Sequence, residues 1–312
     1  MNSGPPVLTN TDLPLSLFRR GKVRDVYDLG DKLLIVSTDR ISAFDVVLPC
    51  GIPDKGRVLN QLSAFWFQKT AHIIPNHVIQ PIDSSDSVGV ILNEVKNLSD
   101  RVGQLPDSLI GRSMVVAKAE RVPVECVVRG YLSGSGWVDY QQTGRIGDIH
   151  LPSGMKEGQE LPEPIFTPTT KSDTEHDRLL TGQDIKDLGM GGIFRELEQK
   201  SLGIYSYARD YARQRGIIIA DTKFEFGFID GKLGLIDELL TPDSSRFWDV
   251  EKYEVGRSQA SLDKQPVRDW LSASGWNKKP PAPTLPPEVI EQTSRRYRDV
   301  YRKLTGSDLK GE

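Results

Sequence analysis

One segment in the second half of the chain alternates charged side chains with apolar ones. In IIIADTKFEFGFI, a β-strand would place Asp221, Lys223 and Glu225 on one face, because successive side chains of a strand point to opposite faces. An Asp-Gly turn would then bring Asp237 and Glu238 back beside them. Carboxylate oxygens are the ligands that Mg²⁺ prefers, so this hairpin is a candidate magnesium site with a lysine among the ligands.

Two interpretations of this charged face stay open. Charge pairs are common on solvated strand faces, where they form cross-strand salt bridges and bind no ligand. The segment begins, however, with three consecutive isoleucines, Ile217 to Ile219, which are typical of a buried strand. Charged groups on a buried strand must be paired or bound to a metal ion.

A second candidate site follows the segment RVPVECVV, whose period of two predicts a strand with one buried face. The next residues, RGYLSGSGW, predict the end of that strand, a Gly/Ser turn and the start of a helix. Free amides at a helix N-terminus, the hydroxyls of Ser133 and Ser135 and the guanidinium of Arg129 would together bind a phosphate monoester. Ordinary capping of the helix by one of the serines explains the same residues equally well.

Basic residues surround a glycine near the N-terminus, in the segment RGKVRD, and form a candidate lid over phosphates. The segment matches neither a Walker A motif nor GxGxxG, and an exposed sheet edge guarded by charge also explains it. Lys118, in VVAKAE, would project from a strand either toward a nucleotide or into solvent.

Three further segments, STDRISAFD, TPTTKSD and TPDSSR, combine Asp, Ser or Pro with a basic residue. Each is explained by local turns. Together they indicate recognition of charged small molecules.

Cysteine and histidine are too sparse to form a metal centre or a nucleophile–base pair. The four histidines, His72, His77, His150 and His176, form no HExxH motif and no close pair. Cys50 and Cys126 stand far apart, which indicates neither a disulfide framework nor a zinc site and favours a reducing compartment. We expect Cys126 to lie in the core.

The composition is that of an ordinary soluble enzyme. The 312 residues carry 40 Lys and Arg against 43 Asp and Glu, a formal net charge of -3, which leaves no cationic excess to bind nucleic acid. No apolar run approaches the roughly 18 residues of a membrane span, and the N-terminus lacks the features of a signal peptide. We therefore expect a cytoplasmic protein that binds neither nucleic acid nor membrane.

The sequence also predicts some of the helices, strands and loops that position these residues. We expect a β-hairpin turning at residues 29–32, an irregular segment at 40–55 and a helix at 57–70. Residues 1–130, including the apolar run at 89–95, should be mostly β. The proline-rich stretch at 147–173 predicts a long loop. We then expect a helix at 191–215 that ends at Gly216, followed by the hairpin that contains Asp221. The chain should end with a stiff proline-rich linker and a terminal helix packed on the body.

Six segments, in the same order along residues 20–272, resemble the SAICAR synthetase family. They are GKVRDVY, STDRISAFDV, VPVECVVRGYLSGSGW, PEPIFTPTTKSD followed by EHD, GIIIADTKFEFG and DELLTPDSSRFW. The resemblance implies an α+β fold with a β-rich ATP-binding lobe at residues 1–120 and a larger α/β substrate- and metal-binding lobe at 121–275. It implies an active-site cleft between the lobes and a linker and helix at 276–312.

The resemblance also implies an ATP-dependent ligase of purine biosynthesis, acting as a monomer. The family joins L-aspartate to the carboxylate of carboxyaminoimidazole ribonucleotide (CAIR), with ATP converted to ADP and phosphate. A carboxylate is a poor acyl donor, so phosphorylating it first supplies a good leaving group. Such chemistry needs Mg²⁺, lysines and arginines more than a nucleophilic side chain.

By the same resemblance, every candidate residue receives a role. The residues expected to bind ATP are Gly21, Lys22, Arg24, Lys118 and Glu120. Those expected to bind CAIR and aspartate are Asp39, Arg40, Ser42, Asp45, Arg129, Ser133, Ser135, Lys171, Asp243 and Arg246. The expected catalytic residues are Lys223, Asp221 and Arg246, and the expected Mg²⁺ ligands are Glu225 and Asp237.

Two rival functions would use the same residues. A small-molecule kinase shares the ATP and Mg²⁺ site, but it leaves the phosphoryl group on its acceptor, whereas a ligase releases phosphate only when both CAIR and aspartate are present. A nucleotide-sensing protein without turnover has no need of the complete set formed by Asp221, Lys223, Glu225 and Asp237.

Overall fold

The computed structural model describes residues 7–84, 106–171 and 178–311. The apolar run at 89–95 and the EHD string with His176 lie outside these residues. The chain forms two compact units. Unit 1 comprises residues 1–67, 77–118 and 263–312, and unit 2 comprises residues 68–76 and 119–262. The division at residues 120 and 275 that the sequence suggested for the functional lobes stays a prediction.

Unit 1 is built on a five-stranded antiparallel sheet with the strand order β1-β2-β3-β7-β6. The expected hairpin is confirmed, with Gly30 at a φ of 94° in its turn, a conformation that glycine adopts without strain. Apolar side chains of the sheet, among them Tyr27, Leu34 and Val115, form one of its cores. The strands are β1 (Ser16–Arg20), β2 (Arg24–Asp28), β3 (Lys32–Ser37), β6 (Val78–Pro81) and β7 (Ser113–Ala117).

The helix expected after this hairpin is confirmed as α1 (Lys55–Thr70), and its side chains Leu62 and Trp66 are fully buried. The prediction of an irregular segment at residues 40–55, before this helix, is wrong. Residues 40–51 form a second hairpin from β4 (Arg40–Ala43) and β5 (Val46–Gly51). In its turn, Phe44 and Asp45 have φ values of 52° and 63°, which residues other than glycine rarely adopt. Because no glycine stands at these two positions, the sequence does not indicate a turn there.

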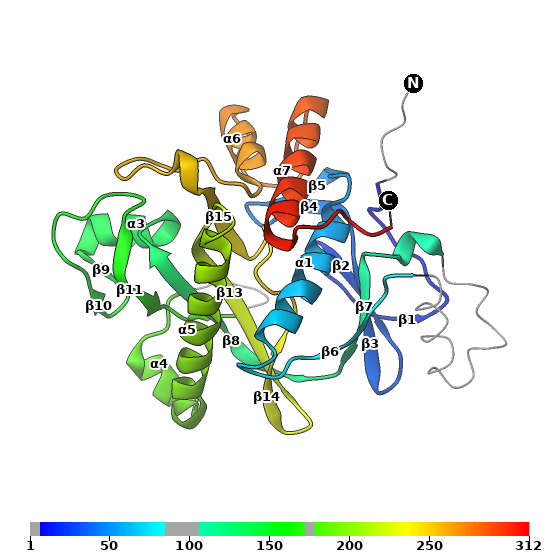
Figure 1. Cartoon of the computed structure of the whole chain (residues 1–312), viewed down its shortest axis with the longest axis horizontal. Helices are drawn as coiled ribbons and strands as arrows, with labels where there is room; N and C mark the ends of the chain where they lie inside the picture. The colour runs from blue at the N-terminus through cyan, green and yellow to red at the C-terminus, as the bar shows by residue number, and fades with distance from the viewer. Residues whose placement is uncertain (1–6, 85–105, 172–177, 312) are drawn as a thin grey trace. The chain divides into compact units, whose positions relative to one another are not determined.

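The C-terminal residues pack on unit 1, as expected for the terminal helix. Helix α7 (Pro287–Thr305) buries Tyr297, Val300 and Leu304 completely. It lies beside α6 (Gln265–Ala273), which the sequence analysis did not predict, and both helices are seen in Figure 1. A short 3-10 helix, η1 (Asp107–Leu109), precedes β7.

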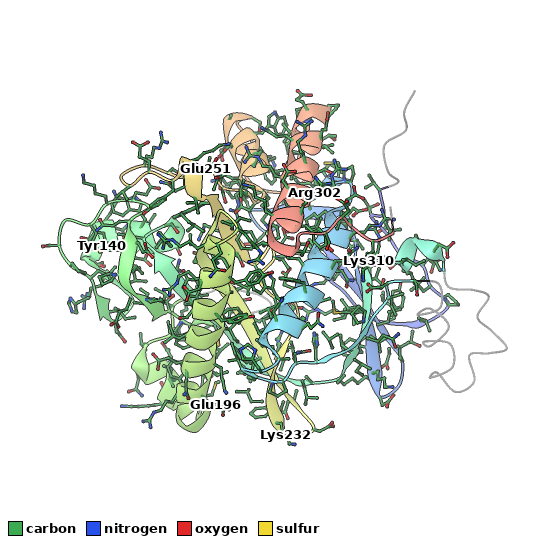
Figure 2. The ribbon with its side chains drawn as sticks, viewed as in Figure 1. Tyr140, Glu196, Lys232, Glu251, Arg302 and Lys310 are labelled. Carbon is green, nitrogen blue, oxygen red and sulfur yellow. The ribbon has the colours of Figure 1, made fainter. Side chains whose placement is uncertain are left out.

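Unit 2 contains a six-stranded antiparallel sheet with the main order β11-β8-β13-β14, in which β12 also pairs with β8 and β15 with β13. The predicted charged strand is confirmed as β13, and its turn at residues 230–231 leads into β14. Lys232 marks the exposed tip of this hairpin (Figure 2). The strands are β8 (Glu120–Tyr131), β11 (Glu160–Phe166), β12 (Thr169–Thr170), β13 (Ile217–Ile229), β14 (Lys232–Ile236) and β15 (Ser245–Asp249).

The long loop expected at residues 147–173 is wrong, because β11 and β12 lie within it, together with β10 (Ile149–His150), which pairs with β9 (Arg145–Ile146). Strand β11 contains Pro162 and Pro164 and still pairs with β8 across an irregular register. Proline lacks an amide hydrogen, but β11 is an edge strand of this sheet, where one side needs no donors.

One face of this sheet is covered by a long helix, α5 (Gly191–Arg213) (Figure 1). The helix ends two residues before the expected limit, and Gly216 follows it at a φ of 74°. The hydroxyl of Tyr205 on α5 donates to the carbonyl of Ile219 and lies so close to Gly130 that no side chain would fit there. The opposite sheet face carries the charged residues. Unit 2 also contains α3 (Gly134–Thr143), α4 (Gly182–Asp187) and η2 (Val250–Lys252).

Candidate active site

The register of three strands gathers the predicted residues of unit 2 on one sheet face. Asp221 of β13 is paired with Arg129 of β8 on one side and with Arg246 of β15 on the other. Two residues further along β13, Lys223 lies opposite Val127, and after two more, Glu225 lies opposite Glu125. Because side chains alternate along a strand, these positions share one face.

At one end of the face, a single buried carboxylate binds two arginines. Asp221 is 6% exposed, and its Oδ2 accepts from Nη1 of Arg129 at 3.2 Å and from Nη1 of Arg246. One negative and two positive charges leave this group with an excess of one positive charge. We name Arg129, Asp221 and Arg246 the arginine row. Its charge suits an anionic ligand.

Arg129 is anchored by three different side chains. Besides Asp221, its Nε donates to the Thr167 hydroxyl at 3.0 Å, and its Nη2 donates to the Ser135 hydroxyl at 3.1 Å. Ser135 lies in the first turn of α3, so Arg129 connects the sheet to the start of that helix. A guanidinium with fixed hydrogen bonds in several directions is held rigidly, which is what a binding site requires.

The interpretation of Ser133 as an ordinary helix cap is wrong. Ser133 occupies the N-cap position of α3, but its side chain makes no capping hydrogen bond. Its hydroxyl is buried and has no hydrogen-bond partner in the part of the chain that the structure describes. The neighbouring Gly134 has a φ of 55°, and a Cβ there would lie 2.6 Å from Cζ of Arg246. The helix start therefore contacts the arginine row directly.

At the other end of the face, two carboxylates and two ammonium groups are packed together. Nζ of Lys223 donates to Oε1 of Glu125 at 2.8 Å. Lys171, which follows β12, lies 3.6 Å from the same oxygen and forms an ion pair with Glu225. We name Glu125, Lys171, Lys223 and Glu225 the lysine cluster. It is electrically balanced, and the interpretation of β13 as a merely solvated face is wrong because Asp221 and Glu225 are buried.

Glu125 received no role in the sequence analysis. Its alternation with Cys126 was readable and predicts that the two side chains point to opposite faces. That Glu125 lies directly opposite Glu225 depends on the pairing register of β8 and β13, which no local signal encodes.

The lysine cluster keeps Lys223 protonated. Burial alone would lower the pKa of the Lys223 ammonium, but the charge and hydrogen bond of Glu125 raise it above its ordinary value. A protonated lysine on this face would attract a substrate carboxylate or phosphoryl group.

Asp237 follows β14, whose last residue, Ile236, is the cross-strand partner of Glu225. The side chain of Asp237 is half-buried. No group of three or more acidic, histidine or cysteine side chains converges as a metal site in the described ranges. Glu225 and Asp237 stay the predicted Mg²⁺ ligands, since Mg²⁺ commonly binds one or two protein carboxylates and takes its other ligands from water and phosphate oxygens.

Asp243 belongs to a compact turn that leads into β15. The backbone amides of Asp243 and Ser244 both donate to the hydroxyl of Thr241, at 3.2 and 3.3 Å. The Thr241 hydroxyl in turn donates to Glu238 at 2.6 Å. The interpretation of this segment as a local turn is therefore confirmed, and the turn positions Arg246 two residues later.

In unit 1, the turn between β1 and β2 contains the glycine and lysine expected to bind phosphates. Nζ of Lys22 forms an ion pair with Asp45 at 2.6 Å, and both side chains are more than half exposed. The carbonyl oxygens of Gly21 and Lys22 accept from the buried guanidinium of Arg40 at 3.0 and 3.2 Å. Arg40 also binds Asp25, whose pKa is lowered because the Arg40 and Thr11 hydrogen bonds outweigh the cost of burial.

Several other predicted residues of unit 1 make structural contacts. Asp39 is fully buried, accepts from the amides of Leu8 and Gly56 and lies 3.0 Å from Arg112. Lys118 follows β7 and pairs with Asp28 at 2.9 Å. The binding roles suggested for these residues stay predictions, as do those of Arg24 and Ser42. Glu120, the first residue of β8 in unit 2, is exposed, and its role is a prediction too.

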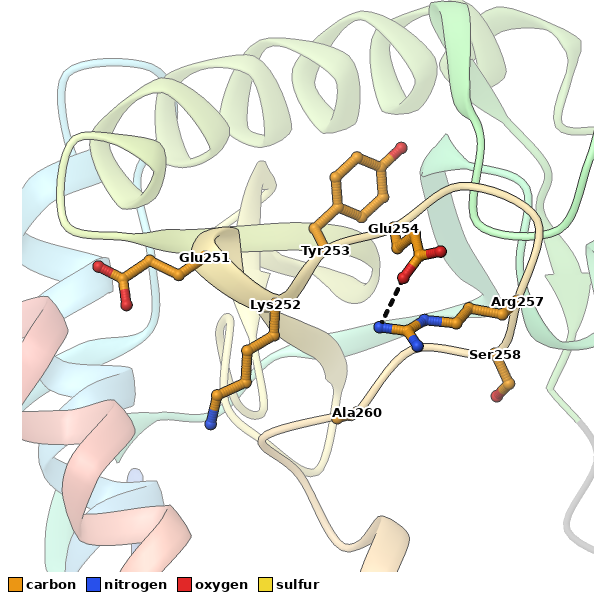
Figure 3. A pocket seen from close by; sticks show the side chains of 7 residues that line it. All are labelled: Glu251, Lys252, Tyr253, Glu254, Arg257, Ser258 and Ala260. Atoms are coloured by element: carbon orange, nitrogen blue, oxygen red, sulfur yellow. Dashed lines mark ion pairs between the residues drawn. The ribbon is translucent and has the colours of Figure 1, made fainter.

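Two other features of unit 2 lie apart from the predicted residues. Cys126 is confirmed as a core residue, and burial raises the pKa of its thiol to about 12, so it is not a nucleophile. A pocket of about 510 Å³ is lined by residues 251–254, 257, 258 and 260, none of them a predicted site residue (Figure 3). It contains the Glu254–Arg257 ion pair, at 2.9 Å.

Comparison with known proteins decides the family. The SAICAR synthetase family model matches residues 17–283. The chain belongs to the SAICAR synthetase family. It is 51% identical over 300 residues to the phosphoribosylaminoimidazole-succinocarboxamide synthase of Thermodesulfovibrio yellowstonii, covering 96% of this chain and 99% of that protein. With the corresponding synthase of Syntrophobacter fumaroxidans it shares 49% identity over the full length of both chains.

Solved SAICAR synthetases have the same fold. The Saccharomyces cerevisiae enzyme, solved with SAICAR bound, is 40% identical with a TM-score of 0.85, covering 96% of this chain and 99% of that one. A SAICAR synthetase solved with ADP is 26% identical with a TM-score of 0.65, covering 93% and 98%. The expected α+β, SAICAR-synthase-like fold is confirmed, and so is the ATP-dependent ligase of purine biosynthesis. No described helix is long and apolar enough to span a membrane.

Proposed function

We propose that the charged sheet face of unit 2 joins the amine of L-aspartate to the carboxylate of CAIR, in a ligase that splits ATP to ADP and phosphate. The observation that carries this proposal is the arginine row beside the start of α3. It combines two guanidinium groups on one buried carboxylate with a helix N-terminus and the Ser133 hydroxyl, which has no hydrogen-bond partner among the described residues. These groups together suit the 5′-phosphate of a ribonucleotide.

In this proposal, Arg129, Ser133 and Ser135 bind the phosphate of CAIR, and Arg246 adds a second positive charge. Asp221 fixes both guanidinium groups by accepting a hydrogen bond from each. With the phosphate at one end of the face, the CAIR carboxylate is directed toward the lysine cluster. We assign Ser42, Asp45 and Asp243 to the binding of CAIR and aspartate, without dividing them between the two substrates. Asp39 and Arg40 are buried, and we assign them the role of holding the neighbouring backbone in place.

The reaction then proceeds in two steps. A carboxylate oxygen of CAIR attacks the γ-phosphorus of ATP, the bond to the β-phosphate oxygen breaks and ADP leaves. The neutral amine of aspartate attacks the resulting acyl phosphate at carbon, and the C–O bond breaks to release phosphate, which takes the proton that the nitrogen loses. Lys223 and Lys171 neutralise the negative charge that develops on the transferred phosphoryl group and on the carboxylate. Their ammonium groups already lie together on the sheet face.

We assign the ATP phosphates to the turn of Gly21, Lys22 and Arg24, and the adenine side to Lys118 and Glu120. Arg40 stabilises that turn, because its guanidinium donates hydrogen bonds to the carbonyl oxygens of Gly21 and Lys22. We assign Mg²⁺ to Glu225 and Asp237, where a bound ion supplies charge neutralisation for phosphoryl transfer. We also propose that the enzyme is a cytoplasmic monomer and binds neither nucleic acid nor membrane.

The proposal is tested by incubating the purified chain with ATP, CAIR and L-aspartate and measuring the product by mass. The expected result is one succinocarboxamide formed for each phosphate released, with no phosphate release when either CAIR or aspartate is omitted. A phosphorylated acceptor that remains the final product when aspartate is also present would support a kinase instead. ATP binding with no turnover under any condition would support a nucleotide sensor.

A further inference from the structure

Glu125 lies at the centre of the lysine cluster, although its sequence context suggested no role. It is 5% exposed, and its cross-strand partner Glu225 is 8% exposed. Two like charges directly opposite each other in a sheet destabilise it unless other groups compensate them. The structure therefore contains a costly arrangement that needs an explanation.

Two lysines from different parts of unit 2 compensate the two glutamates. Lys223 lies on β13 and donates to Oε1 of Glu125 at 2.8 Å. Lys171 follows β12, which pairs with β8 at Thr169 opposite Glu125, and its Nζ lies between Glu125 and Glu225. Glu225 is thus the closer partner of Lys171, and Glu125 is the hydrogen-bond acceptor of Lys223.

A lysine side chain is long and flexible, and each methylene adds a rotatable bond. The Lys223 side chain is 38% exposed, so solvent is open to its ammonium group. Without the charge of Glu125, the two ammonium groups would repel each other across a short distance, and Lys223 could turn outward. The hydrogen bond to Glu125 holds the ammonium group of Lys223 against the sheet.

We propose that Glu125 is a positioning residue of the ligase: it fixes the ammonium group of Lys223 where the reacting carboxylate binds. It acts through Lys223 and does not touch substrate. The inference rests on the proposed function of the charged face. It also explains the opposed glutamates, because each carboxylate pairs with a different lysine: Glu225 with Lys171, and Glu125 with Lys223.

The first test is Glu125→Gln, which preserves the shape of the side chain and removes its charge. Misplacing a reacting group by about 1 Å costs on the order of 10²-fold in rate, so we expect kcat to fall by about that factor. The KM values for ATP and CAIR should change less than about twofold, because the proposed phosphate-binding groups are untouched. The matched control is Glu160→Gln, another ion-paired glutamate of the same sheet, whose side chain is 42% exposed.

The second test is a double-variant cycle with Lys223→Met. If Glu125 acts through Lys223, the double variant should have the kcat of Lys223→Met alone, since the second change removes nothing further. Losses that multiply in the double variant would overturn the proposal, because Glu125 would then act independently of that lysine. So would a Glu125→Gln enzyme with the kcat of the wild type.

Far-UV circular dichroism and thermal unfolding establish whether each variant folds. If Glu125→Gln does not fold, the double variant, which removes both members of the pair, is compared with Lys223→Met. Equal kcat supports the proposal, and a further loss overturns it. A wild-type chain that forms no succinocarboxamide would overturn the proposed function itself, whereas a fully active Glu125→Gln overturns only the role of Glu125.

Discussion

The two ends of the charged sheet face of unit 2 hold their charges in different ways. The arginine row has one carboxylate for two cations, and the lysine cluster has two carboxylates for two cations. The Arg129 side chain is 6% exposed, whereas that of Lys223 is 38% exposed. The first end keeps an excess positive charge, while the second is balanced and has an ammonium group, that of Lys223, that is partly open to solvent.

This difference matches two different tasks. A planar guanidinium with fixed partners binds an anion in one orientation and does not need to move. An ammonium group is a compact point charge, and when it is held in place it neutralises a charge that develops on a nearby reacting group. We therefore assign substrate binding to the arginine row and the chemical step to the lysine cluster, and the following predictions test that division.

The largest effect is expected for the proposed Mg²⁺ ligands. Glu225→Gln and Asp237→Asn should each lower kcat by about 10³-fold or more, because charge neutralisation by the ion contributes several kcal/mol to phosphoryl transfer. Thermal unfolding should show that both variants remain folded. Asp230→Asn is the control, since Asp230 lies exposed in the turn of the same hairpin and asparagine tolerates its positive φ. Full activity of both variants would remove the magnesium assignment.

The next effect concerns the cation of the chemical step. Lys223→Arg keeps the charge but replaces a point charge by a larger planar group, so the contact with Glu125 cannot be kept in the same geometry. We expect kcat to fall by about 10²-fold, with the KM for CAIR nearly unchanged. Steady-state kinetics with each substrate varied in turn measures both constants. A variant with unchanged kcat and a raised KM for CAIR would assign Lys223 to substrate binding. That result would contradict the assignment of the chemical step to the lysine cluster.

The sequence identified all three residues of the arginine row and three of the four residues of the lysine cluster, but not how they are connected. Alternation along β13 correctly grouped Asp221, Lys223 and Glu225, because the period of two is a local property of any strand. The position of Arg129 beside a glycine- and serine-rich turn indicates an anion-binding role. That Arg129 pairs with Asp221 depends on strands 92 residues apart in sequence.

The errors share one physical cause. The hairpin of β4 and β5 and the edge strand β11 are stabilised by pairing partners and packing that no local pattern reveals, and β11 even contains two prolines. Glu125 was overlooked for the same reason, since its neighbours across the sheet were unknown. Residue types and local periods were thus predictable, whereas register and edge position were not.

A smaller effect is expected for the arginine row. Arg129→Lys retains a positive charge but cannot bind Asp221, Thr167 and Ser135 at once. Losing one or two hydrogen bonds to a charged group costs about 1.5–3 kcal/mol, so the KM for CAIR should rise by about 10- to 100-fold. The KM values for ATP and aspartate and kcat should change little. Arg213→Lys, in an exposed ion pair of the same unit, is the control, and equal effects on all three KM values would indicate a structural arginine.

The smallest effect is expected at the contact between the arginine row and α3. In Gly134→Ala the new methyl group would collide with the Arg246 guanidinium, and the φ of 55° is unfavourable for alanine by about 1 to 2 kcal/mol. Gly144→Ala, at the other end of the same helix, has the same conformational penalty at a φ of 70° but meets no atom within 4 Å. Both variants should therefore lose thermal stability, whereas only Gly134→Ala should raise the KM for CAIR, by several-fold, because only there is Arg246 displaced. If both glycine variants bind CAIR equally well, the guanidinium of Arg246 does not contact the substrate phosphate, and Arg129 alone carries the positive charge of the binding end.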